Sequence, residues 1–214
     1  MSFVPASSSA SAAALPSPVA AASPSPEAPR RPHYLLVDGE NIDAVLGNTL
    51  LGGKPAPSQR PQWDHVRAFL ETTFGGPFRL LFFIHHRGPA QMPFIQAITA
   101  IGYKPVLLTG PDDVKVVDEA IIRMLAVLAT DTPVTSSVVL ASHDGMDFAE
   151  PLRPLTGTSR RVAVLGFEEC MSDRFRVLPG IEVYDLEHHA RAFKVELPRL
   201  RATPIDEFDP RRYL

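Results

Sequence analysis

Four aspartates lie next to short apolar runs, in positions where their carboxylates could take part in chemistry. They are Asp38 in LLVDGENID (35–43), Asp118 in KVVDEAIIRML (115–125), and Asp144 and Asp147 in ASHDGMDF (141–148). Clustered carboxylates repel one another, so their pKa values rise unless a cation lies among them. Oxygen-only ligands favour Mg²⁺ or Mn²⁺, and such an ion polarises a phosphodiester and generates hydroxide from bound water. The pattern predicts metal-assisted phosphodiester hydrolysis.

Each aspartate also has an ordinary structural role open to it. Asp38 could simply end a strand, and Asp144 could cap a helix. Asp118 or Asp147 could offset a helix dipole. On a helix, however, Asp118 shares a face with apolar residues three, four and seven positions later. An ionised carboxylate is costly there unless it is paired or bound to metal, which favours a shared site.

The elements that must position these carboxylates alternate along the chain from residue 33. Short apolar runs predict strands at 34–37, 79–85, 104–109, 137–141 and 161–166, with a sixth at 181–184. Helical patterns cover 41–46, 61–73, 90–101, about 112–129 and 148–155. Nearly all-apolar strands alternating with helices are typical of a parallel sheet covered on both faces. The predicted fold class is therefore α/β.

The order of the strands decides whether the carboxylates meet. In an open parallel sheet, ligands bind outside the carboxyl ends of the strands, where the connections diverge. We assume that the second and third strands lie on one side of the first, and the fourth on the other. Asp38 and Asp144 then face each other across one crevice, and Asp118 lies near the same edge.

Composition limits the kind of protein and its setting. The chain has 214 residues, 45% of them hydrophobic, which suits one ordinary soluble domain. Its net charge of −3 gives no whole-molecule attraction for nucleic acid, so binding would need a local basic patch. No run approaches the roughly 18 apolar residues that span a bilayer, so no membrane partner is expected. Cys170 is the only cysteine, which favours a reducing, cytoplasmic setting.

The two ends of the chain differ from the predicted domain at 33–186. Ala, Ser and Pro fill 24 of positions 1–32, which predicts a disordered arm. A secretory signal is the alternative, but the arm has no basic segment before an apolar one. Residues 187–214 predict a C-terminal extension or tail that could pack on the domain through Phe193 or Phe208.

Several motifs, in this order along the chain, resemble the NYN domain family. They are VDGENI (37–42), KVVDEA (115–120), VLASHDGMDFAEPL (139–152) and RRVAVLGF (160–167). These are PIN-like, FLAP-nuclease-type domains regarded as metal-dependent ribonucleases. The resemblance spans about residues 33–185. It implies a three-layer, Rossmann-like fold with a parallel sheet of five to six strands in the order 3-2-1-4-5 and helices on both faces.

The resemblance also implies an activity and its residues. The activity is Mg²⁺- or Mn²⁺-dependent endoribonuclease cleavage of RNA, single-stranded or structured. Asn41 is similar to the family's polar companion after the first strand, and Ser142 to the serine before its fourth-strand aspartate. The residues that resemble the acidic metal-binding and catalytic set are Asp38, Asp118, Asp144 and Asp147.

Further residues are candidates for contacts with substrate. His85, His86 and His143 are expected to make structural or substrate contacts rather than to bind a metal, and His143 is the first candidate for a substrate contact because of its neighbours in the sequence. Arg160 and Arg161 follow the fourth-strand motif and could contact phosphate. A solvated surface role for these arginines is an equal alternative.

Two departures from the family pattern leave a second function open. Gly145 and Met146 both lie between Asp144 and Asp147, where the family has one residue, and Met124 stands where it often has a second acid. A non-catalytic RNA- or protein-binding regulator that keeps the fold is therefore the alternative. A phosphatase on a similar sheet would need a nucleophile motif that the sequence lacks. The oligomeric state is left open.

Overall fold

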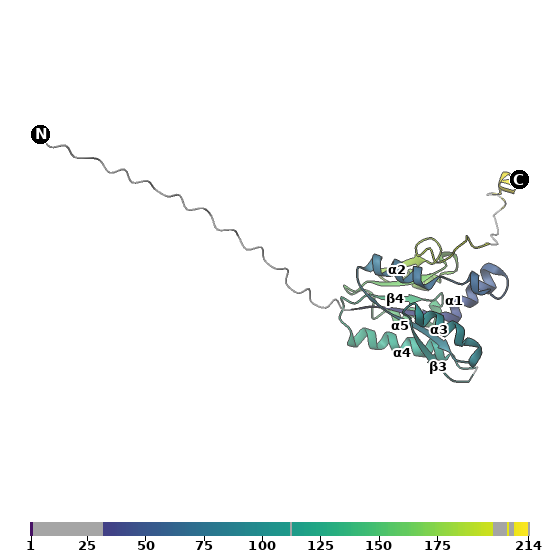
Figure 1. Cartoon of the computed structure of the whole chain (residues 1–214), viewed down its shortest axis with the longest axis horizontal. Helices are drawn as coiled ribbons and strands as arrows, with labels where there is room; N and C mark the ends of the chain where they lie inside the picture. Colours follow the sequence, from purple (N-terminus) through teal and green to yellow (C-terminus); the bar gives the residue numbers. More distant parts are fainter. Residues whose placement is uncertain (2–31, 112, 199–204, 206–207, 214) are drawn as a thin grey trace.

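The computed structural model describes residues 1, 32–111, 113–198, 205 and 208–213 (Figure 1). The arm expected to be disordered, residues 1–32, lies outside the described residues apart from its two ends. Among the residues that are described, no helix is long and apolar enough to cross a membrane.

The centre of the fold is one parallel sheet with the strand order β3-β2-β1-β4-β5-β6. Its strands are β1 (His33–Asp38), β2 (Phe78–His85), β3 (Lys104–Leu108), β4 (Val138–Ala141), β5 (Val162–Gly166) and β6 (Ile181–Asp185). The predicted order is confirmed, and the sixth strand extends the sheet beyond β5. Because β1 and β4 are neighbours, the chain diverges in opposite directions from this pair, as assumed from the sequence.

Helices cover both faces of the sheet. They are α1 (Gly39–Val45), α2 (Trp63–Phe74), α3 (Met92–Ala100), α4 (Val116–Asp131), α5 (Gly145–Leu152) and α6 (Asp173–Arg176). A π-helical segment, Leu46–Leu51, continues α1, and short 3-10 turns lie at Pro57–Gln59, Pro89–Gln91, Glu168–Cys170 and Pro210–Tyr213. The π-helical segment and α6 were not predicted.

The start of α4 differs from the prediction. The pattern placed it at residues 112–113, whereas the helix begins at Val116. The amide of Val114 donates to the carbonyl of Pro111, so the chain first makes a turn. Lys115 occupies the N-cap position, without a side-chain cap.

Alternation along β1 divides the core into two layers. Successive strand residues point to opposite faces, so Leu35 and Val37 join one apolar cluster and Leu36 joins the other. The first cluster lies under α1, α2 and α3, and the second under α4, α5 and α6. Figure 1 shows α2 and α4 on opposite sides of the sheet. The three-layer α/β architecture is therefore confirmed.

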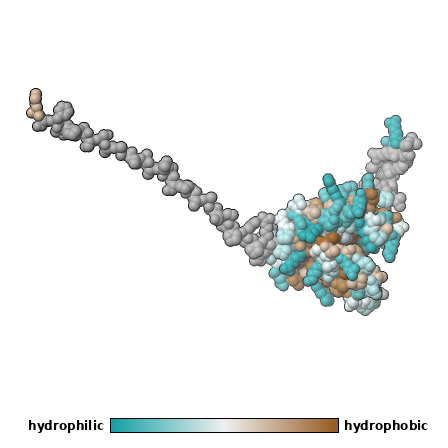
Figure 2. All heavy atoms as spheres, in the orientation of Figure 1, coloured by the Kyte–Doolittle hydropathy of each residue, from teal (hydrophilic) through white to brown (hydrophobic). Residues whose placement is uncertain are grey.

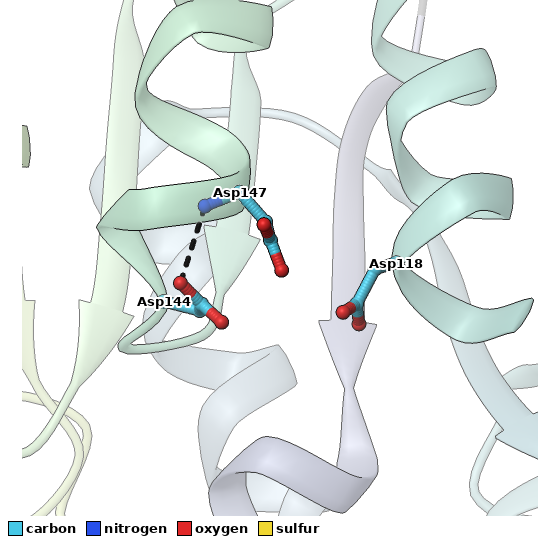
Figure 3. A group of neighbouring side chains, drawn as sticks. All are labelled: Asp118, Asp144 and Asp147. Carbon is cyan, nitrogen blue, oxygen red and sulfur yellow. Dashed lines mark hydrogen bonds between the residues drawn. The ribbon is translucent and has the colours of Figure 1, made fainter. Parts of the chain in front are cut away.

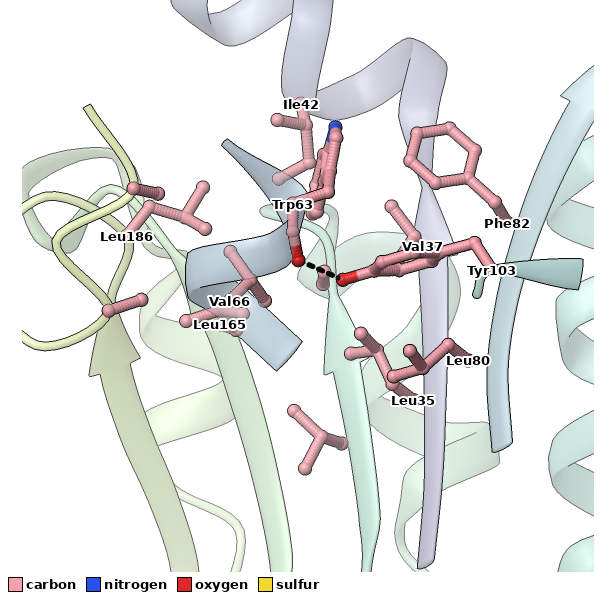
Figure 4. Close-up of a cluster of buried hydrophobic side chains, with 14 of the residues drawn as sticks. Leu35, Val37, Ile42, Trp63, Val66, Leu80, Phe82, Tyr103, Leu165 and Leu186 are labelled. Atoms are coloured by element: carbon pink, nitrogen blue, oxygen red, sulfur yellow. Dashed lines mark hydrogen bonds between the residues drawn. The ribbon is translucent and has the colours of Figure 1, made fainter. Parts of the chain in front are cut away.

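The first cluster contains one buried polar link (Figure 4). The hydroxyl of Tyr103 donates to the carbonyl of Trp63 at 2.8 Å, which joins the start of α2 to the residue before β3. The Trp63 ring packs edge-on against Phe82, with centroids 5.1 Å apart. Because the hydroxyl has a partner, its burial carries no unsatisfied-donor penalty.

The segment after β6 packs on the same cluster. Leu186, Ala192 and Leu197 are buried there. Phe193 packs against Phe167 with centroids 5.8 Å apart, whereas Phe208 is exposed. Figure 2 shows hydrophilic and apolar residues mixed on the visible face of the domain.

Gly39 opens α1 directly after Asp38, against the ring of Phe82. A Cβ atom at this position would lie 2.3 Å from Cε1 of Phe82. The ring cannot move aside freely, because Trp63, Phe94 and Tyr103 pack around it. The close contact between the backbone at position 39 and the Phe82 ring therefore leaves no room for a side chain.

We expect Gly39→Ala to lower the free energy of unfolding by about 1–3 kcal/mol, the usual cost of overpacking. Gly53→Ala is the matched control, because a Cβ there meets no heavy atom within 4 Å. The control should change the free energy by less than about 0.5 kcal/mol. Urea denaturation measures both, and equal losses would contradict the steric explanation.

Candidate metal centre at the carboxyl edge of the sheet

Asp38 ends β1 and is held in place by two neighbouring elements. Its Oδ1 accepts a hydrogen bond from the amide of Asn41 at 3.1 Å, which caps α1. Its Oδ2 accepts from Oγ of Ser142 at 3.1 Å, just beyond β4. The side chain is 3% exposed. Asp38 therefore joins the carboxyl ends of the two central strands.

Burial raises the pKa of Asp38 to about 7, and the nearby charge of Asp118 acts in the same direction. The hydrogen bonds from Asn41 and Ser142 oppose this rise because they favour the charged form. The carboxyl therefore keeps its proton to a higher pH than an exposed aspartate does. A cation bound nearby would shift it towards the ionised form.

The other three aspartates converge from two helix starts (Figure 3). Asp144 caps α5, accepting from the amides of Met146 at 2.9 Å and Asp147 at 3.2 Å. Asp118 lies in the first turn of α4. One carboxylate oxygen from each of Asp118, Asp144 and Asp147 lies within 4.8 Å of the other two. The structure thus brings together three of the four predicted acids.

These three carboxylates fit a small divalent cation. Mg²⁺ binds oxygen at 2.0–2.1 Å in octahedral geometry, so neighbouring ligand oxygens are about 2.9 Å apart and opposite ones about 4.2 Å apart. The three carboxylate oxygens lie within 4.8 Å of one another, so they would move closer together to share one ion. The oxygens of Asp38 are instead engaged with Asn41 and Ser142, so its place is beside this group.

Lys115 places an ammonium among the three carboxylates. Its Nζ lies 3.4 Å from Asp118 and 3.9 Å from Asp144, and it donates a short hydrogen bond to Asp147. That bond lowers the pKa of Asp147, whereas burial raises the pKa of Asp118. The same bond raises the pKa of Lys115, which stays protonated.

The sequence analysis did not include Lys115 in the site, although its position carried a signal. A cation at a helix N-terminus is disfavoured by the helix dipole. Lys115 lies three positions before Asp118, an aspartate on the sheet-facing side of the helix. Its unfavourable position therefore implies that nearby carboxylates compensate its charge. The distance to the α5 carboxylates, however, depends on the tertiary structure.

His143 has the structural role that the sequence left open as the alternative to a substrate contact. Its backbone amide and Nδ1 both donate to Oδ1 of Asn41, at 2.8 and 3.0 Å. Its Nε2 accepts from the amide of Phe167 at 2.7 Å. Burial lowers its pKa to about 4, so the ring is neutral, with the proton on Nδ1. His143 is 6% exposed and joins three loops of the scaffold.

Arg160 and Arg161 do not reach the acidic edge, because both precede the amino end of β5. Arg160 is 6% exposed and donates to Thr132 and to the carbonyl of Ser136. Arg161 pairs with Glu182 at 2.8 Å. The expectation that they contact phosphate at this site is therefore wrong. Both guanidinium groups bind residues near the amino ends of the strands, at the opposite edge of the sheet.

A family model for the NYN domain matches residues 33–178, more than half of the chain. The chain belongs to the NYN domain family. The resemblance seen in the sequence is thus confirmed, and the fold is of the nuclease type. NYN domains act on nucleic acids, and this one carries acids able to bind a divalent cation.

A solved structure gives independent support for the fold. It is a protein of unknown function from Vibrio parahaemolyticus, 18% identical over 73% of this chain and 93% of that chain, with a TM-score of 0.54. No curated protein matches the sequence.

The structure shows where the two departures from the NYN pattern lie, namely Met124 and the wider spacing between Asp144 and Asp147. Met124 is partly buried against the second core cluster, so α4 has an apolar contact at that position. Met146 is exposed on the first turn of α5. Despite the wider spacing, Asp147 still converges with Asp144 because one helical turn brings both to the same end of α5.

We predict that Asp38→Asn stabilises the metal-free protein more at pH 8 than at pH 5. The folded pKa of about 7 exceeds the unfolded value of about 3.9, so wild-type stability falls as pH rises between these values. Asn does not titrate, so the stability of the variant relative to the wild type should rise by about 2.5 kcal/mol between pH 5 and pH 8. Urea denaturation in EDTA measures the gain. A gain in stability that is the same at both pH values would contradict the raised pKa of the buried Asp38 carboxyl.

We predict that Lys115→Gln tightens Mn²⁺ binding by about 5- to 30-fold, because it removes a cation that competes for the same carboxylates. Arg123→Gln is the control, an exposed cation on α4 that pairs with Glu119 instead. Isothermal titration calorimetry measures both affinities. Weaker binding in Lys115→Gln would show that Lys115 supports the ion.

Proposed function

We propose that this NYN domain is a metal-dependent endoribonuclease that hydrolyses RNA phosphodiester bonds at the carboxyl edge of its sheet. The observation that carries the proposal is the convergence of Asp118, Asp144 and Asp147 within 4.8 Å. Asp38 lies at the end of the adjacent central strand. Family membership supports nucleic acid as the substrate class.

Asp118, Asp144 and Asp147 are the residues that would hold Mg²⁺ or Mn²⁺. Such an ion, when bound, supplies polarisation of the phosphate and hydroxide at neutral pH. Asp38 is buried beside the three carboxylates, and a bound cation would favour its ionised form, which can accept a proton.

Ser142 and Asn41 are positioning residues in this proposal. Oγ of Ser142 donates to Asp38 and accepts from the amide of Asp144 at 3.2 Å, so one hydroxyl links two acids. Asn41 accepts from the backbone of His143 and fixes the loop between β4 and α5. Lys115 replaces Arg160 and Arg161 as the proposed phosphate contact, because it is exposed beside the acids.

We further propose that the functional unit extends from residue 33 beyond β6. The segment that contains Ala190 and Leu197 packs into the first core cluster. Its removal would expose the apolar surface beneath it. A cytoplasmic setting and an RNA partner are part of the same proposal.

The second candidate is a non-catalytic regulator that binds RNA or protein. Two observations favour it: Lys115 already neutralises part of the acidic group, and Met124 replaces a possible further acid. A regulator would bind its target without a requirement for divalent metal.

We expect cleavage of a mixed-sequence RNA with Mn²⁺ or Mg²⁺, and none with EDTA. Asp118→Asn and Asp144→Asn should each reduce the rate by at least about 100-fold, because each removes a proposed ligand, and even the loss of a group that only orients a ligand costs about 10- to 100-fold. Asp173→Asn is the matched control, an exposed aspartate on α6 outside the site. RNA binding without metal-dependent cleavage would favour the regulator instead.

A further inference from the structure

A pocket of about 710 Å³ lies beside the acidic site, between α1, the loop after the π-helical segment, the end of β2 and α3. We call it the α1–α3 pocket. Residues that line it include Glu40, Lys54, Arg60, Arg87 and Phe94. Its volume falls within the range of sites for small organic groups.

One wall of the α1–α3 pocket is aromatic. Phe94 is half-buried, and its ring packs edge-to-face against Phe82 with centroids 5.3 Å apart. The guanidinium of Arg60 lies 5.8 Å from the centre of the same ring and is held by Asp43 at 2.8 Å. Aromatic rings and guanidinium planes are the surfaces on which unpaired bases stack.

The pocket is locally basic although the chain has a net charge of −3. Three cations line it, Lys54, Arg60 and Arg87, against two carboxylates, Glu40 and Asp43. Lys54 is exposed. An anionic ligand with a flat apolar part complements this combination of charge and rings, and a nucleotide has both.

The pocket also adjoins the acidic site. Glu40 and Arg87 line it and also line a second pocket of about 170 Å³ that contains Lys115 and Asp118. These two shared residues form an exposed ion pair at 2.7 Å. Exposed pairs of this kind contribute little to stability, so Arg87 can exchange Glu40 for a phosphate.

We propose that the α1–α3 pocket binds one unpaired nucleotide of the RNA next to the bond that is cleaved. The base stacks on Phe94, and Lys54 and Arg87 contact the backbone phosphates on the way to Asp118. This inference rests on the proposed function, because it assigns a place to that substrate. It implies a preference for single-stranded RNA, since a paired base cannot enter a pocket of this kind.

The test measures binding separately from cleavage. A short single-stranded RNA that carries one 2-aminopurine base is titrated with protein in EDTA, and stacking on Phe94 quenches the fluorescence. Phe94→Leu keeps an apolar side chain but removes the ring, so affinity should fall about 5- to 100-fold and the quench should disappear. Phe94→Tyr keeps an aromatic ring, so both the affinity and the quench should be retained.

Matched controls separate the pocket from general effects. Phe69→Leu changes a half-buried aromatic on α2 that packs against Tyr184 instead, and should leave affinity unchanged. Lys54→Gln should weaken binding and flatten its salt dependence, whereas Lys104→Gln, on the other edge of the sheet, should not.

The outcomes distinguish this proposal from the proposed function. Phe94-dependent RNA binding in a protein that never cleaves RNA would support the pocket proposal and contradict the proposed nuclease activity. Metal-dependent cleavage, together with unchanged affinity and quench in Phe94→Leu, would contradict the pocket proposal alone. The pocket proposal would also be contradicted if Phe69→Leu lost as much affinity as Phe94→Leu, or if the wild type did not bind single-stranded RNA.

Discussion

Repulsion among carboxylates at one edge of the sheet is the constraint on which the rest of the site depends. Asp118, Asp144 and Asp147 converge there, and Asp38 lies close enough for the charge of Asp118 to raise its pKa. Helix-start amides and the Lys115 ammonium offset this repulsion. An arrangement of this kind is electrostatically unfavourable without a cation, which is why it is suited to bind one.

The scaffold keeps this unfavourable arrangement rigid. Asn41, His143 and Phe167 form a chain of hydrogen bonds, part-buried at Asn41 and buried at Phe167, that joins α1 to the ends of β4 and β5. Beneath it, all four residues of β4 and all five of β5 are buried. The polar edge therefore rests on strands with little freedom to separate and relieve the repulsion.

Charge is divided between two adjacent parts of the same edge. The acids lie where α4 and α5 begin, and the α1–α3 pocket carries Lys54, Arg60 and Arg87, of which Arg87 lines both the pocket and the smaller pocket at Asp118. A negatively charged polymer would be repelled by the first part and attracted by the second. The division gives a physical basis for holding a phosphate backbone against a metal-binding group despite a negative net charge.

The sequence by itself determined the α/β class, the strands and the placement of acids at strand and helix ends, because hydropathy and short-range spacing are local properties. The resemblance to NYN domains supplied the strand order from β3 to β5. Only the tertiary structure showed that His143 is buried, that Arg160 and Arg161 hold the opposite edge, and that Lys115 reaches Asp147. Helix α6, with four residues, is too short for a periodic pattern. These features depend on contacts between segments far apart in the chain, and sequence spacing does not fix such distances.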